Sequence, residues 1–144
     1  MIFEKQIINI YKKMMFSRCD DIETVHYFSH TDFKNLNAIS YPFKSSLGHN
    51  LQGYLYYCNN QKENRLIVFD HGFGGGHKAY MKEIVMLCNK GYRVFSYDHT
   101  GCMESEGDSP NGLAQSLFDL NVTQHNSIFS LLEYVINVLP AFSV

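Results

Sequence analysis

The sequence predicts an α/β fold with a mixed sheet. Two strand-like segments flank a polar turn, and a strand, a helix and a second strand then follow with short connections. Strand–helix–strand units of this kind form parallel pairs joined by a right-handed crossover, and a hairpin ahead of them adds antiparallel strands. A long helical pattern closes the order of elements.

The composition is that of one globular domain with no surface suited to nucleic acid. The chain has 144 residues, is 45% hydrophobic and 18% charged, and carries a net charge of −2. No basic face dominates, and no apolar run is long enough for a transmembrane segment. The cysteines are scattered without a Cys-x-x-Cys pair, which indicates reduced thiols in a cytoplasmic protein. They are Cys19, Cys58, Cys88 and Cys102.

Residues 1–38 are expected to form an amphipathic helix and an irregular lead-in. Phe3, Ile7, Ile10 and Met14 recur at helical spacing. Charged residues interrupt this stretch, so it is a poor signal peptide. The apolar side is expected to pack on the domain itself or on a partner, and the modest positive excess also permits transient contact with an anionic membrane surface.

Residues 39–144 are expected to form a partial α/β domain. The β-propensities and turn residues predict the hairpin, and the short continuous apolar run after it is typical of a strand buried on both faces. Helical periodicity over residues 79–89 is followed by Gly91, which is well placed to end that helix. The expected strands are 39–45, 51–58, 66–70 and 92–98, and the expected helices are 79–89 and 113 to about 138.

The glycine cluster at residues 72–76, after the first parallel strand, has three possible chemical roles. A phosphate-binding loop is excluded, because His77 stands where a glycine is needed and Ala79 where a hydroxyl is needed. A dinucleotide fingerprint is closer: Gly72 and Gly74 fit, and Asp98 ends the next strand. His77 again replaces its third glycine, and the upstream hairpin is foreign to that fold. An oxyanion loop, which needs backbone N–H donors held open by glycines, explains more residues at once.

Three stretches together carry a family resemblance. "FKSSLGHNLQGYLYY", "LIVFDHGFGGG" and "GYRVFSYDHTGCMESEG" resemble the opening hairpin, the oxyanion loop and the second signature of α/β-hydrolases of the monoglyceride-lipase and serine-aminopeptidase type. The similarity runs from about residue 40 to about 135, the N-terminal half of that fold. Met103 stands where the family often has glycine. The resemblance implies a sheet order of first, second, fourth and third strand.

The resemblance also implies roles for residues in the two signatures. The backbone N–H of Phe73 would be the first oxyanion donor, and His71 would hold the loop by a hydrogen bond rather than act as a base. Supporting residues of that loop would be Gly72, Gly74 and Gly75. The loop after the second parallel strand would be fixed by Asp98, Gly101, Ser105, Glu106 and Gly107. A structural alternative is that 72–76 is only a tight turn.

No cofactor is implied, and the substrate would be a small acyl compound. No histidine pair has the spacing of a helical metal site, so no metal is expected, and the six histidines other than His71 are expected to be surface or core residues.

The family's nucleophile motif G-x-S-x-G does not occur in this sequence. The nearest string, 107–111, ends in Asn111 and lies in a loop. The nucleophile, acid and base are therefore expected to lie outside this chain, which would be catalytically incomplete alone. Three origins stay open: a truncated or split reading frame, a deliberate fragment, and a non-catalytic remnant acting as an interaction module. An unpaired strand 66–70 would favour self-association.

Overall fold

The core of the computed structural model, which describes residues 2–59 and 65–123, is a four-stranded mixed sheet. Its order is β1–β4–β6–β5, and these strands span Leu36–Ser40, Gly53–Cys58, Arg93–Tyr97 and Leu66–Phe69. β4 runs antiparallel to both β1 and β6, whereas β5 and β6 are parallel. The α/β fold class and the order of first, second, fourth and third strand are confirmed.

The hairpin differs in detail from the two uninterrupted strands that the sequence predicts. β1 begins at Leu36, inside the predicted lead-in, and a separate ladder joins β2 (Phe43–Lys44) to β3 (Asn50–Leu51). Pro42 separates β1 from β2 and has no backbone N–H for a ladder. Between β3 and β4, the N–H of Gln52 donates to Ser105 Oγ at 2.9 Å instead of to a neighbouring strand.

The crossover between the parallel strands contains two short helices. A 3₁₀ turn, η2 (His77–Tyr80), leads into α2 (Met81–Asn89). The predicted stop at Gly91 is confirmed: its φ is 95°, and the N–H groups of Gly91 and Tyr92 donate to the carbonyls of Cys88 and Leu87. This pair of bonds is a Schellman motif, which requires the left-handed conformation that glycine adopts without strain.

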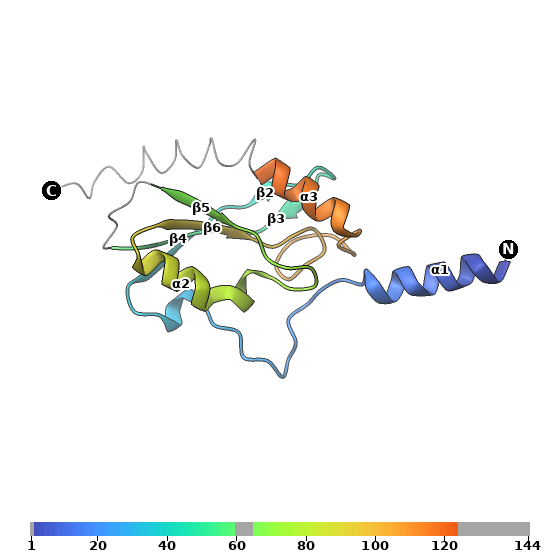
Figure 1. Cartoon of the computed structure of the whole chain (residues 1–144), viewed down its shortest axis with the longest axis horizontal. Coiled ribbons are helices and arrows are strands. Elements are labelled where there is room, and N and C mark those ends of the chain that lie inside the picture. Colours follow the sequence, from blue (N-terminus) through green and yellow to red (C-terminus); the bar gives the residue numbers. More distant parts are fainter. Residues whose placement is uncertain (1, 60–64, 124–144) are drawn as a thin grey trace.

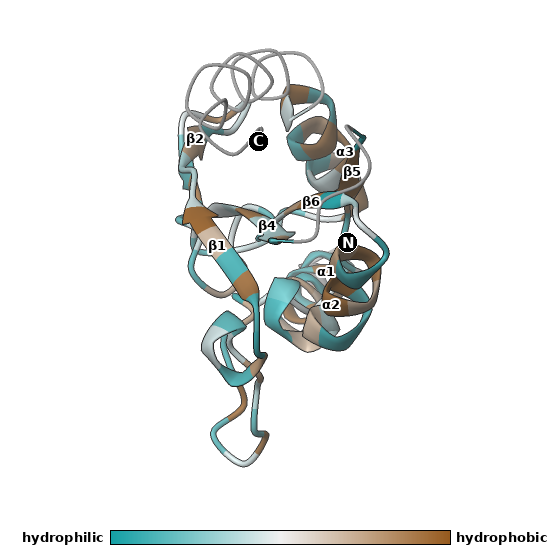
Figure 2. Cartoon of the chain, turned by 90° about the vertical axis from the view of Figure 1, so that its left-hand side faces the viewer, coloured by the Kyte–Doolittle hydropathy of each residue, from teal (hydrophilic) through white to brown (hydrophobic). Residues whose placement is uncertain are grey.

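The sheet is covered on both faces, by α2 on one side and by α3 (Leu113–Val122) on the other (Figures 1 and 2). Strand alternation divides the buried apolar residues into two clusters. The cluster against α2 contains Leu36, Tyr56, Cys58, Met81, Ile84, Cys88 and Val94. The other contains Leu51, Leu55, Phe95 and Tyr97.

β5 is only half-buried along its whole length, although its apolar run predicts burial on both faces. In the part of the chain that the structure describes, β5 pairs with β6 alone and lies at the sheet's edge. Self-association through 66–70 stays a prediction.

α3 presents polar residues to the fold. Gln115 and Asp119 are buried, whereas Leu117, predicted as one of its apolar positions, is 66% exposed. The reason is that Asp119 accepts hydrogen bonds from the backbone and side chain of Thr100. The predicted continuation to about residue 138, with its apolar positions 128, 131, 132 and 135, lies outside the described residues.

The predicted N-terminal helix is present as α1 (Ile2–Met15) and projects away from the sheet (Figure 1). Every residue from 3 to 15 is exposed, so the expected packing on its own domain does not occur. After α1 the chain forms η1 (His30–Asp32), which Ser29 caps. Within 2–59 and 65–123, no helix has the length and apolarity needed to cross a membrane.

Candidate functional site

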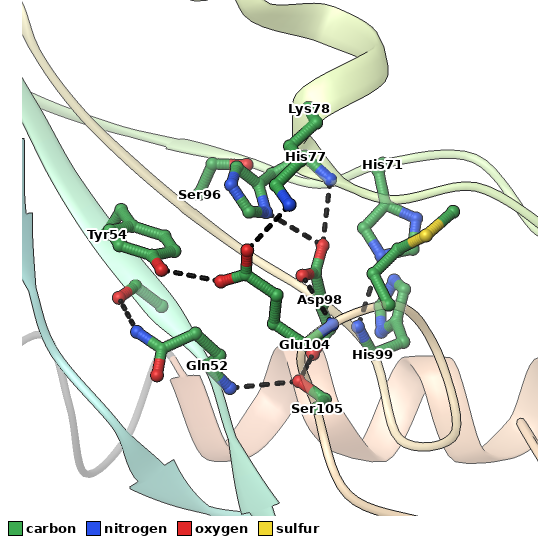
Figure 3. A network of polar contacts seen from close by, with 12 residues as sticks. Gln52, Tyr54, His71, His77, Lys78, Ser96, Asp98, His99, Glu104 and Ser105 are labelled. Carbon is green, nitrogen blue, oxygen red and sulfur yellow. Dashed lines mark hydrogen bonds and ion pairs between the residues drawn. The ribbon is translucent and has the colours of Figure 1, made fainter. Parts of the chain in front are cut away.

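The residues singled out by the two signatures meet at the carboxyl ends of β5 and β6. The loop 70–76 leaves β5 and the loop 98–107 leaves β6, and because these strands are parallel their carboxyl ends share one edge of the sheet. Ligand sites of open α/β sheets lie at this edge. Figure 3 shows the polar network that joins the two loops.

The glycine loop is an open turn. The N–H of Gly75 donates to the carbonyl of Gly72 at 3.3 Å, and Gly74 has a φ of 80° with nothing within 4 Å of the position of a Cβ. Phe73 is 42% exposed. Among the described residues, no acceptor pairs with its backbone N–H. An N–H held in this way can donate to a ligand.

His71 joins the two loops and has one defined tautomer. Its Nε2 accepts the backbone N–H of His99 at 3.1 Å, so its Nδ1 carries the proton and donates to the carbonyl of Gly72 at 2.8 Å. Burial and the neighbouring His99 lower the pKa of His71, which keeps the ring neutral. Both ring nitrogens are occupied, so His71 positions the loop and has no free lone pair with which to act as a base.

Asp98, at the end of β6, is fully buried and holds the start of η2. Its Oδ1 accepts the backbone N–H and the Nδ1 of His77, at 2.8 Å and 2.9 Å, and its Oδ2 accepts the N–H of Glu104 at 3.3 Å. Burial disfavours the charge on Asp98, but the hydrogen bonds from His77 outweigh it and hold the pKa of Asp98 below its usual range. Asp98 therefore fixes both loops.

Ser105 is buried and its hydroxyl is fully engaged. Its Oγ donates to the carbonyl of Asp98 at 2.6 Å and accepts the N–H of Gln52. Glu106, beside it, accepts the backbone and side-chain N–H groups of Asn50, both at 2.7 Å. These bonds tie the loop to the hairpin, and they leave Ser105 unsuited to nucleophilic attack.

Met103 stands where the signature that this sequence resembles often has glycine. Its φ is 45°, in the left-handed region that non-glycine residues rarely occupy.

A second charged cluster surrounds His99, which the sequence did not single out. His99 Nε2 lies 2.9 Å from Asp70 Oδ1, and its Nδ1 lies 3.8 Å from Asp119 Oδ2, within ion-pair reach but too far for a hydrogen bond. Burial favours a neutral ring, but the carboxylates of Asp119 and Asp70 outweigh it and raise the pKa of His99 to about 9. The only sequence signal was the position of Asp70 and His99 just after parallel strands.

Arg18 holds the second loop from the far end of the sequence. Its guanidinium donates to the carbonyls of Met103, Ser105 and Gly107 at 2.6–3.0 Å. The backbone of Cys19 pairs with Gly101 and Met103 beside it. The lead-in therefore forms part of the site's support.

Replacing Arg18 by alanine is expected to lower the free energy of unfolding by roughly 2 kcal/mol, because three carbonyls lose a charged donor. Amide exchange over 103–107 should accelerate at the same time. Lys34→Ala, at an exposed position, is the control. Unchanged exchange in the Arg18→Ala protein would show that the loop holds its conformation without the guanidinium.

No protein-family model and no curated protein sequence matches the chain. Among solved structures, it is similar to an esterase from Pyrococcus furiosus in two crystal forms. The TM-scores are 0.58 and 0.55, with 16% and 17% identity over 78% and 73% of this chain, and 44% and 40% of the esterase chain. A mutant of the Vigna radiata epoxide hydrolase scores 0.46 at 19% identity, over 67% of this chain and 28% of that one.

The similarity to the esterase shows the fold. The chain has the fold of the N-terminal part of an α/β-hydrolase, and it spans less than half of the esterase's length.

Proposed function

We propose that the chain is the N-terminal portion of a serine-type α/β-hydrolase of the monoglyceride-lipase and serine-aminopeptidase branch. It would act on a carboxylic ester or a related acyl substrate and contribute the oxyanion loop. The reducing environment that suits its free thiols favours the cytoplasm.

The observation that carries this proposal is the backbone N–H of Phe73. It has no acceptor among the described residues, lies in a glycine turn at the carboxyl end of β5, and is positioned by the hydrogen bond from His71 to Gly72. An oxyanion hole needs donors fixed before the reaction, because they then stabilise developing charge without reorganisation.

As a second part of this proposal, residues 1–144 on their own do not hydrolyse substrate. The sequence lacks G-x-S-x-G, and the hydroxyls of Ser105 and Ser109, on the loop after β6, are engaged. Ser105 Oγ donates to Asp98, and Ser109 Oγ donates to the carbonyl of Phe16 at 2.5 Å. Each hydroxyl donates its proton to a backbone carbonyl, which is not a general base.

The chain alone is expected to give no hydrolysis of p-nitrophenyl acetate above the buffer rate and no labelling by a fluorophosphonate. Labelling abolished by Ser105→Ala or Ser109→Ala would show that the chain carries its own nucleophile. The gene sequence after the codon of Val144 is the second test. A continuation with G-x-S-x-G, an acid and a histidine supports the hydrolase, and a continuation without them contradicts it.

In an enzyme completed by such a continuation, Gly74→Val is expected to lower kcat by on the order of a hundredfold or more, as loss of one oxyanion donor does. Gly48→Val is the control, because Gly48 has a similar φ of 83° and open space around it. Equal kcat values in the two folded variants would remove the loop from the mechanism.

An interaction module is the alternative function. Leu113, Leu117 and Phe118 form an exposed apolar strip on α3, each more than half exposed. Exposed apolar patches mark interaction sites. A stable complex that shows no hydrolysis would favour this second function.

A further inference from the structure

Helix α1 exposes more large apolar side chains than any other element that the structure describes. Phe3 is 80% exposed, Met14 76% and Ile7 65%, and four more apolar residues of this helix are about half exposed. Those four are Ile8, Ile10, Tyr11 and Met15. Exposed apolar surfaces of this kind mark sites that bind another protein or a membrane.

The apolar residues form one broad face. At 100° per residue, Phe3, Ile7, Ile10 and Met14 fall within about 60° of arc, and the other three widen the face to about 160°. Glu4 is the one charged residue within that arc. A two-stranded coiled coil uses a narrower seam and three or more heptads, whereas α1 has 14 residues. The width of the face favours a lipid surface over a second copy of the helix.

Positive charge lies on the opposite side of α1. Lys5, Lys12 and Lys13 flank the polar face, so this helix is cationic in a chain whose net charge is −2. Lys12, Lys13 and Arg18 also line an open groove of about 570 Å³ between the end of α1 and the loop at Asp108 and Ser109. Two of the three lysines therefore lie beside this groove, while the apolar residues of α1 are exposed along the helix, which projects away from the sheet (Figure 1).

We propose that α1 binds the surface of an anionic lipid bilayer, with its apolar face in the acyl boundary and its lysines among the headgroups. A helix of 14 residues is about 21 Å long, shorter than the roughly 30 Å hydrocarbon core, so it lies on the bilayer instead of crossing it. The segment 16–19 fixes α1 to loop 101–109 through Arg18 and Cys19, so binding brings the candidate site to the membrane surface.

Tryptophan fluorescence tests this proposal directly, because the chain has no tryptophan of its own. Tyr11→Trp places the probe on the apolar face and Asn9→Trp places it on the polar face of the same helix. With phosphatidylserine-containing vesicles, the emission of the Tyr11→Trp protein is expected to shift to shorter wavelength, and that of the Asn9→Trp protein is expected to change little. No shift in the first protein, or equal shifts in both, would overturn the proposal.

Co-sedimentation of residues 1–144 with vesicles separates the contribution of the lysines to binding from that of the apolar face. Lys12→Gln with Lys13→Gln is expected to weaken binding about 30-fold, and salt should weaken it further. Ile7→Ser with Ile10→Ser should abolish binding, whereas Gln6→Ser with Asn9→Ser, on the polar face, should not. Equal binding to phosphatidylcholine vesicles with and without phosphatidylserine would contradict the role of charge. A dimer that Ile7→Ser with Ile10→Ser dissociates, with no vesicle binding, would instead assign the face to a second copy.

Discussion

Replacing Gly101 by alanine is expected to remove roughly 2 to 5 kcal/mol of stability, a large fraction of the stability of a typical domain. Gly101 has a φ of 69°, where an L-residue is strained. An added Cβ would lie 2.3 Å from the carbonyl carbon of Ser109 and 2.6 Å from the nitrogen of Pro110. Both are backbone atoms, so the loop itself would have to move.

Gly48→Ala is the matched control for this substitution. Gly48 has a φ of 83° and nothing within 4 Å of an added Cβ, so only the conformational strain of roughly 1 to 2 kcal/mol applies. Urea unfolding of the three proteins gives both differences, and the gap between the two variants measures the contact with 109–110. If both variants lose the same stability, the close approach of the two backbone segments does not exist in solution.

Gly101 also illustrates what the sequence could predict. The second signature predicted that Gly101 belongs to the loop after the second parallel strand. Regular hydrophobic patterns predicted the type and order of the main helices and strands. Met103 is the informative exception. It stands where the signature that this sequence resembles often has glycine, and its φ of 45° lies in the left-handed region that glycine adopts most readily. The stop at Gly91 was predictable, because a helix end of this kind demands a left-handed φ, and Gly91 has a φ of 95°.

Contacts between distant segments were not predictable in this way. Arg18 donates hydrogen bonds to carbonyls that lie 85 to 89 residues further along the chain. The polar stretch around Arg18 contains no local sequence pattern that predicts such a contact. α3 shows the same limit. Its apolar periodicity predicts that Leu117 faces the fold, but Asp119 reaches the backbone of Thr100 instead, and a satisfied buried carboxylate determines which side of the helix is inside.

The environment of His99 also depends on three separate segments. Asp70 follows β5, His99 follows β6 and Asp119 lies on α3, so the ion pairs form only when the sheet and the helix are in place. The resulting group is an imidazolium with 3% of its side chain exposed. The rings of His71 and Tyr97 pack against it at 4.4 Å and 5.1 Å between ring centroids.

The stability of the protein is expected to depend on the protonation of His99. Its pKa is raised to about 9 in the folded chain, whereas an unfolded histidine titrates near 6.5. A group whose pKa is raised by folding stabilises the protein fully below its unfolded pKa, and this contribution is lost as the pH rises through the folded pKa. The free energy of unfolding should therefore fall by roughly 3 kcal/mol between about pH 6.5 and 9 on account of this residue.

His99→Gln isolates that contribution. The difference in unfolding free energy between the original protein and this variant is expected to be largest near pH 6 and to shrink toward pH 9. Taking the difference cancels the groups that titrate in both proteins, including the thiols of Cys58 and Cys88, whose pKa values burial raises. A difference that stays constant from pH 6 to 9 would mean that folding does not raise the pKa of His99, and that the carboxylates of Asp70 and Asp119 do not stabilise a charged ring.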